Sequence, residues 1–289
     1  MGLSVFSHVQ SLLDTLRLIR VFNCLLAMAG VWIGAHMTWL VPTYYGPLVA
    51  SLAAFCVCAA GNVLNDIVDI EIDRINHPTR VLVRQALTVR FARWLTITFN
   101  LLAVALAVAV NWEVTAIVAG AVGLLVLYNL TLKKIALLGN VAVAFLAAFT
   151  FMTGGWAVDH LLAVTLPGPL IAAVFAFFFH LVREIVKDVQ DIEGDRRAGY
   201  RSLPIRIGTS RSLIIAVGLF VILVLLTIVP VVTGWYGYAY EVITLYAVGL
   251  PLLAFLIFIW GNPVPRMLQA GSFALKAGML LGLIALLIA

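Results

Sequence analysis

Two segments of the chain carry aspartates at the same spacing. Residues 61–73 read GNVLNDIVDIEID, and residues 184–195 read EIVKDVQDIEGD. In each segment three aspartates stand at positions i, i+3 and i+7, and they are Asp66, Asp69 and Asp73 in the first and Asp188, Asp191 and Asp195 in the second. At about 100° per residue these positions fall on one stripe of a helix. Asn62 and Glu184, each four residues earlier, share that stripe.

Three carboxylates on one stripe repel each other, so a positive partner must neutralise them near hydrocarbon. Oxygen ligands suit a hard cation, and Mg²⁺ typically binds through one or two carboxylates together with substrate phosphates. The chain has no histidine or thiolate set that would favour zinc or copper. The two stripes therefore predict Mg²⁺ ions that bridge one diphosphate. The expected metal ligands are Asp66, Asp69, Asp188, Asp191 and Asn62.

Two other interpretations of the stripes stay open. A solvated helix end explains one acidic stripe, but it explains two with identical spacing less well. Carboxylates within a membrane also mark ion or proton pathways, which makes a transporter the more distant alternative. The predicted topology places both stripes on one side of the membrane, and no carboxylate path crosses it, so this alternative fits less well.

The composition identifies the surroundings of these residues as lipid. The 289 residues are 64% hydrophobic and 11% charged, with a mean hydropathy of +1.12, whereas soluble domains are about 45–50% apolar and about 25% charged. A span needs about 20 apolar residues. Nine segments qualify, at 18–37, 44–64, 91–110, 113–131, 138–157, 164–186, 211–231, 240–260 and 268–288. We expect an all-α membrane protein whose nine helices form one bundle, a single domain over residues 1–289.

Basic residues predict the orientation of the bundle. The linkers between spans alternate between basic and nearly uncharged, and the basic set holds all but Lys276 of the 18 lysines and arginines. The positive-inside rule then places the N-terminus and both aspartate segments in the cytoplasm and the C-terminus outside. The localisation expected is a multi-pass protein, of the cell membrane in a prokaryote. Topology accounts for the net charge of +5, so no nucleic-acid partner is expected.

Taken together, the residues resemble the UbiA-type intramembrane prenyltransferases. The two aspartate segments, the first preceded by Asn65, are similar to the two motifs of that family. Arg20 and Asn23 match a recurrent Arg-x-x-Asn, and Tyr128 is followed by Lys133 and Lys134 as in the family. The loop from Gly194 to Pro204, which includes Arg201, matches the family's loop after the second motif.

The resemblance implies prenyl transfer from an allylic prenyl diphosphate with Mg²⁺, in nine transmembrane helices. The expected catalytic residues are the six aspartates and Tyr128, whose ring would face the allylic cation. The expected substrate-binding residues are Arg20, Asn23, Asn62, Asn65, Arg80, Arg84, Lys133, Lys134, Glu184, Lys187 and Arg201. The expected partners are the donor, a membrane-soluble acceptor and membrane lipids, with no obligate protein partner.

Two parts of the sequence bear on the identity of the acceptor. The string from Arg183 to Asp195 resembles the archaeal-type branch, whose enzymes add a second geranylgeranyl chain to geranylgeranylglyceryl phosphate. Family members often carry Arg-Pro-x-Pro-Ser-Gly-Arg after the first motif, whereas this chain has Arg80-Val-Leu-Val-Arg84-Gln-Ala. We expect the additional charge of Arg84 to bind a phosphate-bearing acceptor. An aromatic acceptor, such as a quinone precursor or a chlorin, is the alternative.

Overall fold

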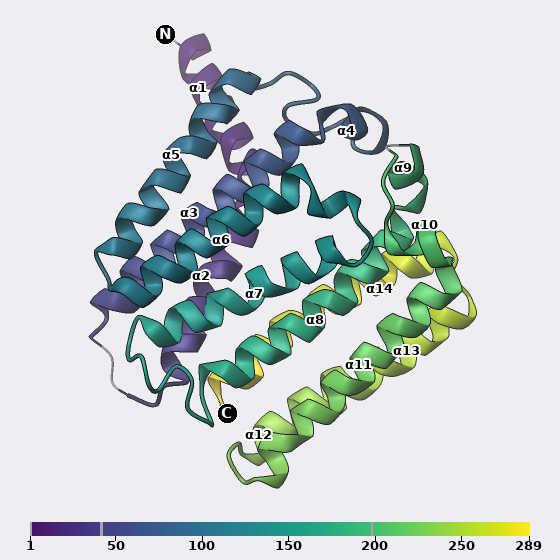
Figure 1. The fold of residues 1–289 in the computed structure, drawn as a ribbon. Coiled ribbons are helices and arrows are strands. Elements are labelled where there is room, and N and C mark those ends of the chain that lie inside the picture. Colours follow the sequence, from purple (N-terminus) through teal and green to yellow (C-terminus); the bar gives the residue numbers. More distant parts are fainter. Residues whose placement is uncertain (1, 41–42, 198) are drawn as a thin grey trace.

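Long apolar helices make up most of the computed structural model, which describes residues 2–40, 43–197 and 199–289 (Figure 1). Within these residues, eight helices are long and apolar enough to cross a membrane. A ninth span arises if the bent pair Val9–Leu18 and Val21–His36, which meet at 54°, is counted as one. The expected all-α membrane architecture with about nine spans is therefore confirmed.

The helices and their bounds are α1 Gly2–Leu18, α2 Val21–His36, α3 Tyr45–Val68, α4 Ile70–Asn76, α5 Val89–Val108, α6 Trp112–Leu130, the 3₁₀ turn η1 Leu132–Lys134, α7 Leu138–Trp156, α8 Pro169–Gln190, α9 Ile192–Arg197, α10 Leu203–Ile207, α11 Thr209–Val232, α12 Tyr238–Glu241, the π-helical η2 Val242–Gly249, α13 Leu250–Gly261 and α14 Pro265–Leu287. The elements α12, η2 and α13 together form one span, Tyr238–Gly261.

Local sequence signals explain several helix starts. The side chain of Thr88 accepts a hydrogen bond from the Phe91 amide at 3.1 Å, and that of Asn111 accepts one from Val114 at 2.8 Å. These are N-caps that satisfy free amides of α5 and α6. Helix α8 begins at Pro169, five residues later than the predicted span 164–186. Proline is favoured in the first helical turn, which explains this boundary.

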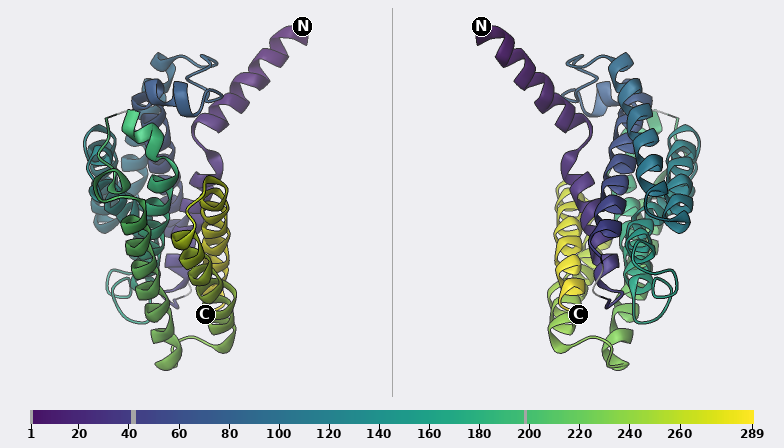
Figure 2. Two further views of the ribbon diagram at one scale, coloured as in Figure 1. Left: turned by 90° about the vertical axis from the view of Figure 1, so that its right-hand side faces the viewer. Right: turned by 90° about the vertical axis from the view of Figure 1, so that its left-hand side faces the viewer.

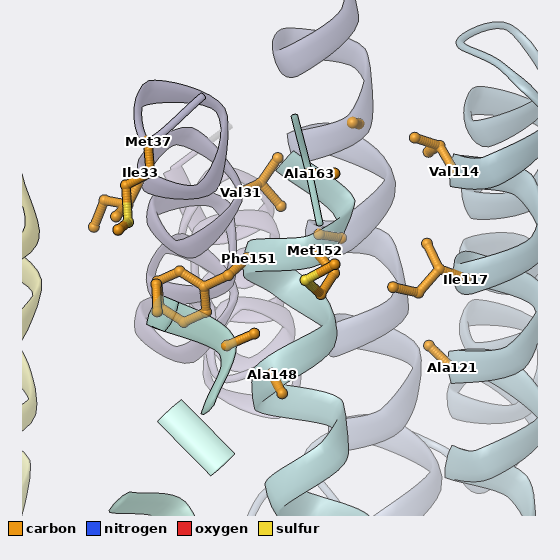
Figure 3. Packing of buried hydrophobic residues seen from close by; sticks show 14 of the residues in the cluster. Val31, Ile33, Met37, Val114, Ile117, Ala121, Ala148, Phe151, Met152 and Ala163 are labelled. Atoms are coloured by element: carbon orange, nitrogen blue, oxygen red, sulfur yellow. The ribbon is translucent and has the colours of Figure 1, made fainter. Parts of the chain in front are cut away.

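Helices α2 and α7 approach each other closely enough for their backbones to be in contact. A Cβ placed on Gly34 would collide with the backbone oxygen of Phe151, and one on Gly154 would collide with that of Val31. Gly30 and Gly34 are spaced four apart, the small-residue pattern that lets membrane helices approach closely. Figure 3 shows the buried side chains beside this contact, among them Val31, Phe151 and Met152.

The outward faces of the bundle carry large apolar side chains that are exposed in the isolated chain. Phe22, Leu101, Val232 and Phe273 are 68–79% exposed. Lipid would cover such side chains in a membrane. A second buried cluster lies between α8, α11, α13 and α14, so the two halves of the bundle each have a core.

Both aspartate motifs lie at the end of the bundle that carries the N-terminus. The short helices α4 and α9 follow α3 and α8 at that end and contact each other (Figure 1). The C-terminus lies toward the opposite end, and α1 projects away from the bundle (Figure 2). The two motifs, which have the same spacing in the sequence, therefore also lie at the same end of the bundle.

Each motif departs from the single continuous helix that the spacing predicts. Helix α3 ends before Asp69 and α4 begins after it, and α8 and α9 break in the same way at Asp191. The ψ angles of these two aspartates are 7° and 5°, outside the helical range. Asp69, the middle aspartate of the first motif, makes tertiary contacts at this break. The spacing of the aspartates in the sequence does not predict these contacts.

The close approach of α2 and α7 predicts the effect of one added methyl group. Gly154→Ala should lower the free energy of unfolding by about 1–3 kcal/mol, because the methyl forces two backbones apart. Gly120→Ala in α6 is the matched control, because nothing lies within 4 Å of its Cβ position. Thermal unfolding in detergent measures both. Equal stability of Gly154→Ala and the wild type would contradict the packing.

Candidate active site

A cavity of about 930 Å³ connects the two aspartate motifs. Its polar end is lined by carboxylates of both, and they are Asp69, Asp73, Asp188, Asp191 and Asp195. Its remaining wall is mostly apolar and comes from membrane-spanning helices, including α2, α6, α7, α8, α11 and α14. The arrangement combines an anionic end with a long apolar chamber.

Two arginines neutralise the first aspartate of the first motif. Asp66 is buried, and its Oδ1 accepts hydrogen bonds from Arg20 at 2.6 Å and from Arg80 at 3.1 Å. Arg80 also pairs with Asp73. Arg20 stands between α1 and α2 with φ of 53°, so the bend between these helices directs its side chain toward α3. Asp66 therefore lies behind the cavity wall, held by two cations.

The middle aspartate of the first motif joins three parts of the chain. Asp69 pairs with Lys133 from η1, and it accepts a hydrogen bond from the hydroxyl of Tyr200 at 3.1 Å. Asn65, one turn earlier, donates to it at 2.9 Å. Because Tyr200 follows the second motif, Asp69 is a direct link between the two motifs.

A short backbone pairing positions the two partners of Asp69. The amide of Arg201 donates to the carbonyl of Lys134 at 3.1 Å, and Ile135 and Arg201 form an isolated parallel bridge. This pairing ties the turn that carries Lys133 to the loop that carries Tyr200. The arrangement explains why both side chains reach the same carboxylate.

Burial shifts the pKa values of groups at this end of the bundle. Desolvation raises the pKa of Asp73 above its ordinary value, and the neighbouring Arg80 opposes that shift. Desolvation likewise raises the pKa of Asp195. The pKa of Lys133 is lowered by burial, although Asp69 opposes it. In each of these groups, burial disfavours the charged form.

The second motif has fewer cationic partners than the first. Asp188 accepts a hydrogen bond from the amide of Asn140 at 2.9 Å. Lys187 lies 3.5 Å from Asp191, and Arg183 pairs with Glu184. Asn140 stands in the first turn of α7, so the end of that helix supports Asp188 from the neighbouring span.

The structure places most of the predicted site residues on the cavity wall. Besides the five carboxylates, these are Arg20, Asn23, Asn62, Asn65, Arg80, Tyr128, Lys133, Glu184 and Lys187. The amide nitrogen of Asn62 donates to the carbonyl of Ile19 at 2.8 Å, which leaves its oxygen as the group available to a ligand.

Four predicted residues lie off the wall, namely Asp66, Arg84, Lys134 and Arg201. Lys134 and Arg201 take part through the backbone pairing. Arg84 pairs instead with the buried Asp14 of α1. This placement does not fit the expectation that Arg84 binds the acceptor. The positive charge of Arg84 therefore holds α1 in place. The sequence pattern does not reveal this pairing.

Several wall residues were absent from the predicted set, and they are Asn129, Asn140, Arg183, Tyr200, Ser202 and Lys276. Asn129 is fully buried, lies 3.3 Å from Asn65 and donates to the carbonyl of Leu125. A side-chain amide within an apolar span is costly unless it has a hydrogen-bond partner. Asn129 and Asn140 could therefore have been recognised in the sequence as candidate site residues. Tyr200 had no signal beyond its place in the loop.

The residues fit a divalent cation held jointly with a ligand. Among the described residues, no three histidine, cysteine, aspartate or glutamate side chains converge as a ready-made metal cage. The site instead offers oxygen donors from two motifs that face one cavity. Mg²⁺ retains few protein ligands and takes others from substrate phosphates, so this donor set suits it.

The apolar chamber opens toward the outer surface of the bundle. Phe22 and Leu25 of α2 and Leu280 of α14 line it, and these side chains are 49–79% exposed. Helices α2 and α14 lie beside each other here (Figure 2). An apolar chain in the membrane could therefore enter between them without passing through water.

Comparison with known proteins agrees with this geometry. Residues 24–275 match the UbiA prenyltransferase family. The chain is 35% identical over 273 residues to a digeranylgeranylglyceryl phosphate synthase from Methanopyrus kandleri, covering 94% of this chain and 97% of that protein. It is 34% identical to the enzyme of the same name from Methanococcus maripaludis strain C6, covering 94% and 95% of the two chains.

Solved structures have the same fold. A structure of digeranylgeranylglyceryl phosphate synthase is 31% identical, has a TM-score of 0.75, and is covered over 98% of its length by 96% of this chain. A UbiA homologue from Archaeoglobus fulgidus, bound to DMAPP and Mg²⁺, is 19% identical with a TM-score of 0.63, covering 96% of this chain and all of that one. The chain is an integral membrane prenyltransferase and belongs to the UbiA prenyltransferase family.

Proposed function

We propose that this chain transfers a prenyl group, with Mg²⁺, from a prenyl diphosphate to the free hydroxyl of a prenylglyceryl phosphate lipid. Residues 1–289 form one domain for this reaction. The motif end of the bundle faces the cytoplasm, as the distribution of basic residues favours. One observation carries the proposal, namely a cavity with carboxylates of two motifs at one end and an apolar chamber behind them.

The two motifs would share one donor diphosphate. We assign the metal ligands to Asp66, Asp69, Asp188, Asp191 and the amide oxygen of Asn62. Bound Mg²⁺ would neutralise the charge that develops on the departing diphosphate. Asp66 and Asp69 are now paired with arginine and lysine, so those cations must shift toward phosphate oxygens when the donor binds.

Basic residues at the polar end have a direct role in this assignment. Arg20, Arg80, Lys133 and Lys187 line the cavity beside the carboxylates. Each would donate hydrogen bonds to phosphate oxygens, and such charge-assisted bonds are the strong ones. Lys134 and Arg201 support the same end through their backbone pairing. Asp73 and Asp195 complete the anionic end.

The chemical step is the exchange of one carbon–oxygen bond for another. The bond between C1 of the prenyl group and the diphosphate oxygen breaks, and the leaving diphosphate keeps the electron pair. The acceptor's hydroxyl oxygen then bonds to C1 and gives up its proton, which the departed diphosphate would accept. Tyr128 lines the cavity in the last turns of α6, where its ring would face the allylic cation. The apolar wall would exclude water from that cation.

The acceptor is inferred from relatives. Proteins at 34–35% identity over 94% of this chain carry the name digeranylgeranylglyceryl phosphate synthase. That name implies a glyceryl phosphate lipid as acceptor and geranylgeranyl as the transferred group. The lateral opening beside Phe22 and Leu280 is compatible with an acceptor that never leaves the membrane.

Product analysis tests the proposed acceptor. Purified protein incubated with Mg²⁺ and geranylgeranyl diphosphate should convert geranylgeranylglyceryl phosphate to a product heavier by one geranylgeranyl group, detected by mass spectrometry. Aromatic acids and chlorins, offered at equal concentration, should give no product. Prenylation of an aromatic acceptor without reaction of the lipid would overturn the acceptor and leave the family unchanged.

Isosteric substitutions test the roles of the carboxylates. Asp69→Asn and Asp191→Asn should each lower kcat/KM by at least about a hundredfold, because they remove charge next to the diphosphate. Glu71→Gln and Glu193→Gln are matched controls in the same motifs. Their side chains are 78% and 69% exposed, and they pair with Arg74 and Arg197, respectively. Similar losses in both sets would contradict the assignment.

A further inference from the structure

Lys276 is the central residue of the 23-residue helix α14. It lies about 16 Å along the helix axis from the first residue, Pro265. Lysines close to helix ends can extend to the membrane surface, but a central lysine cannot do so as readily. Ionisable residues within membrane spans are costly, so this position needs a physical explanation.

Lys276 lines the cavity, and the residue is exposed there. It shares one helical stripe with Met279, Leu280, Leu283 and Leu286, and all five line the chamber. No carboxylate lies within ion-pair distance of Lys276 among the residues that the structure describes. Lys276 is therefore the charged residue of a helical stripe that is otherwise apolar.

Arg183 of α8 provides a second cation on the same cavity. A Cβ placed on Gly278 of α14 would lie 3.2 Å from the ring of Phe179, which places these two residues at the same level. Arg183 is one turn beyond Phe179 toward the motif end, and Lys276 is half a turn beyond Gly278 in the same direction. The two cations thus occupy similar depths on neighbouring helices.

Arg183 has hydrogen-bonding capacity left over. One of its terminal nitrogens pairs with Glu184, but its Nε is buried and has no hydrogen-bond partner within the part of the chain that the structure describes. Buried donors of this kind are rarely left without a partner in native proteins. The buried Nε of Arg183 and the amine of Lys276 could together bind an anion.

This anion is not the donor diphosphate in its proposed position. Arg183 precedes Asp188 by five residues, which is about 7.5 Å deeper along α8. The donor's apolar chain extends into the chamber from the polar end, so its charge remains beside the aspartates. A glyceryl phosphate acceptor, in contrast, must hold its own phosphate away from the diphosphate while its hydroxyl approaches C1.

We propose that Lys276 and Arg183 bind the phosphate monoester of the acceptor lipid, in a second anion site within the cavity. The inference rests on the proposed function and refines it. Arg84, which was expected to bind the acceptor, pairs with Asp14 and does not line the cavity. Lys276 and Arg183 would provide the positive charge for the acceptor phosphate instead. The separation of the two anions on opposite sides of C1 would limit their repulsion and orient the hydroxyl.

Kinetics of Lys276→Gln test the proposal. The substitution should raise KM for geranylgeranylglyceryl phosphate by about tenfold or more, because it removes a charged hydrogen bond to phosphate. KM for the donor should stay within about twofold. Lys276→Arg should largely restore KM for the acceptor. Arg266→Gln, which removes an exposed charge from the first turn of the same helix, is the matched control and should behave as the wild type.

Two comparisons identify the source of the anion. With the dephosphorylated acceptor geranylgeranylglycerol, the wild type and Lys276→Gln should have equal kcat/KM, since no phosphate is present to bind. Inorganic phosphate should inhibit use of this neutral acceptor by the wild type and inhibit Lys276→Gln less.

Other outcomes overturn the inference in distinguishable ways. An unchanged acceptor KM in Lys276→Gln rejects the anion site and leaves the proposed function standing. A rise in donor KM alone assigns Lys276 to the diphosphate instead. Loss of kcat in Lys276→Arg with unchanged KM indicates a role as a base, because arginine cannot give up its proton. A wild type that ignores the phosphate lipid rejects both proposals.

Discussion

The constraint on which the structure depends is the concentration of carboxylates at one end of an apolar helix bundle. Each buried carboxylate loses hydration, and neighbouring carboxylates repel each other, so the charges persist only with cations or hydrogen-bond donors beside them. The protein supplies those partners from widely separated parts of the chain. Asp66 is held by residues that precede α2 and follow α4, and Asp69 is held by η1 and the loop after α9.

These partners also connect the two halves of the fold. The backbone pairing between Lys134 and Arg201 joins the loop after α6 to the loop after the second motif. The hydroxyl of Tyr200 then reaches across to Asp69. The contacts that neutralise the carboxylates therefore also assemble the site. These ion pairs could exchange partners when a diphosphate and its metal bind. The carboxylates would then bind the metal, and the arginines and lysines would donate hydrogen bonds to phosphate oxygens.

The sequence predicted much of this arrangement because its signals are local or simple. Apolar length locates the helices, and matching aspartate spacing identifies the paired motifs at one end of the bundle. Other features depend on packing that the pattern does not contain. The break at Asp69 goes together with contacts made by Lys133 and Tyr200, and the loop arginine Arg84 is taken by Asp14. In the sequence, Lys276 is noticeable only as the one basic residue outside the basic linkers. Its position on the cavity wall is seen only in the structure.

In the proposed mechanism, the two motifs bind one diphosphate as a unit, through Mg²⁺. Binding of a non-reactive prenyl diphosphate analogue, measured by calorimetry across a Mg²⁺ titration, tests it most directly. The analogue should bind tightly to the wild type only with Mg²⁺, and binding should be lost with a chelator. Asp69→Asn and Asp191→Asn should each weaken it strongly, and the double variant should bind little worse than either single variant, since residues that act as a unit are non-additive. Tight binding without metal, or fully additive losses in the double variant, would contradict a shared site.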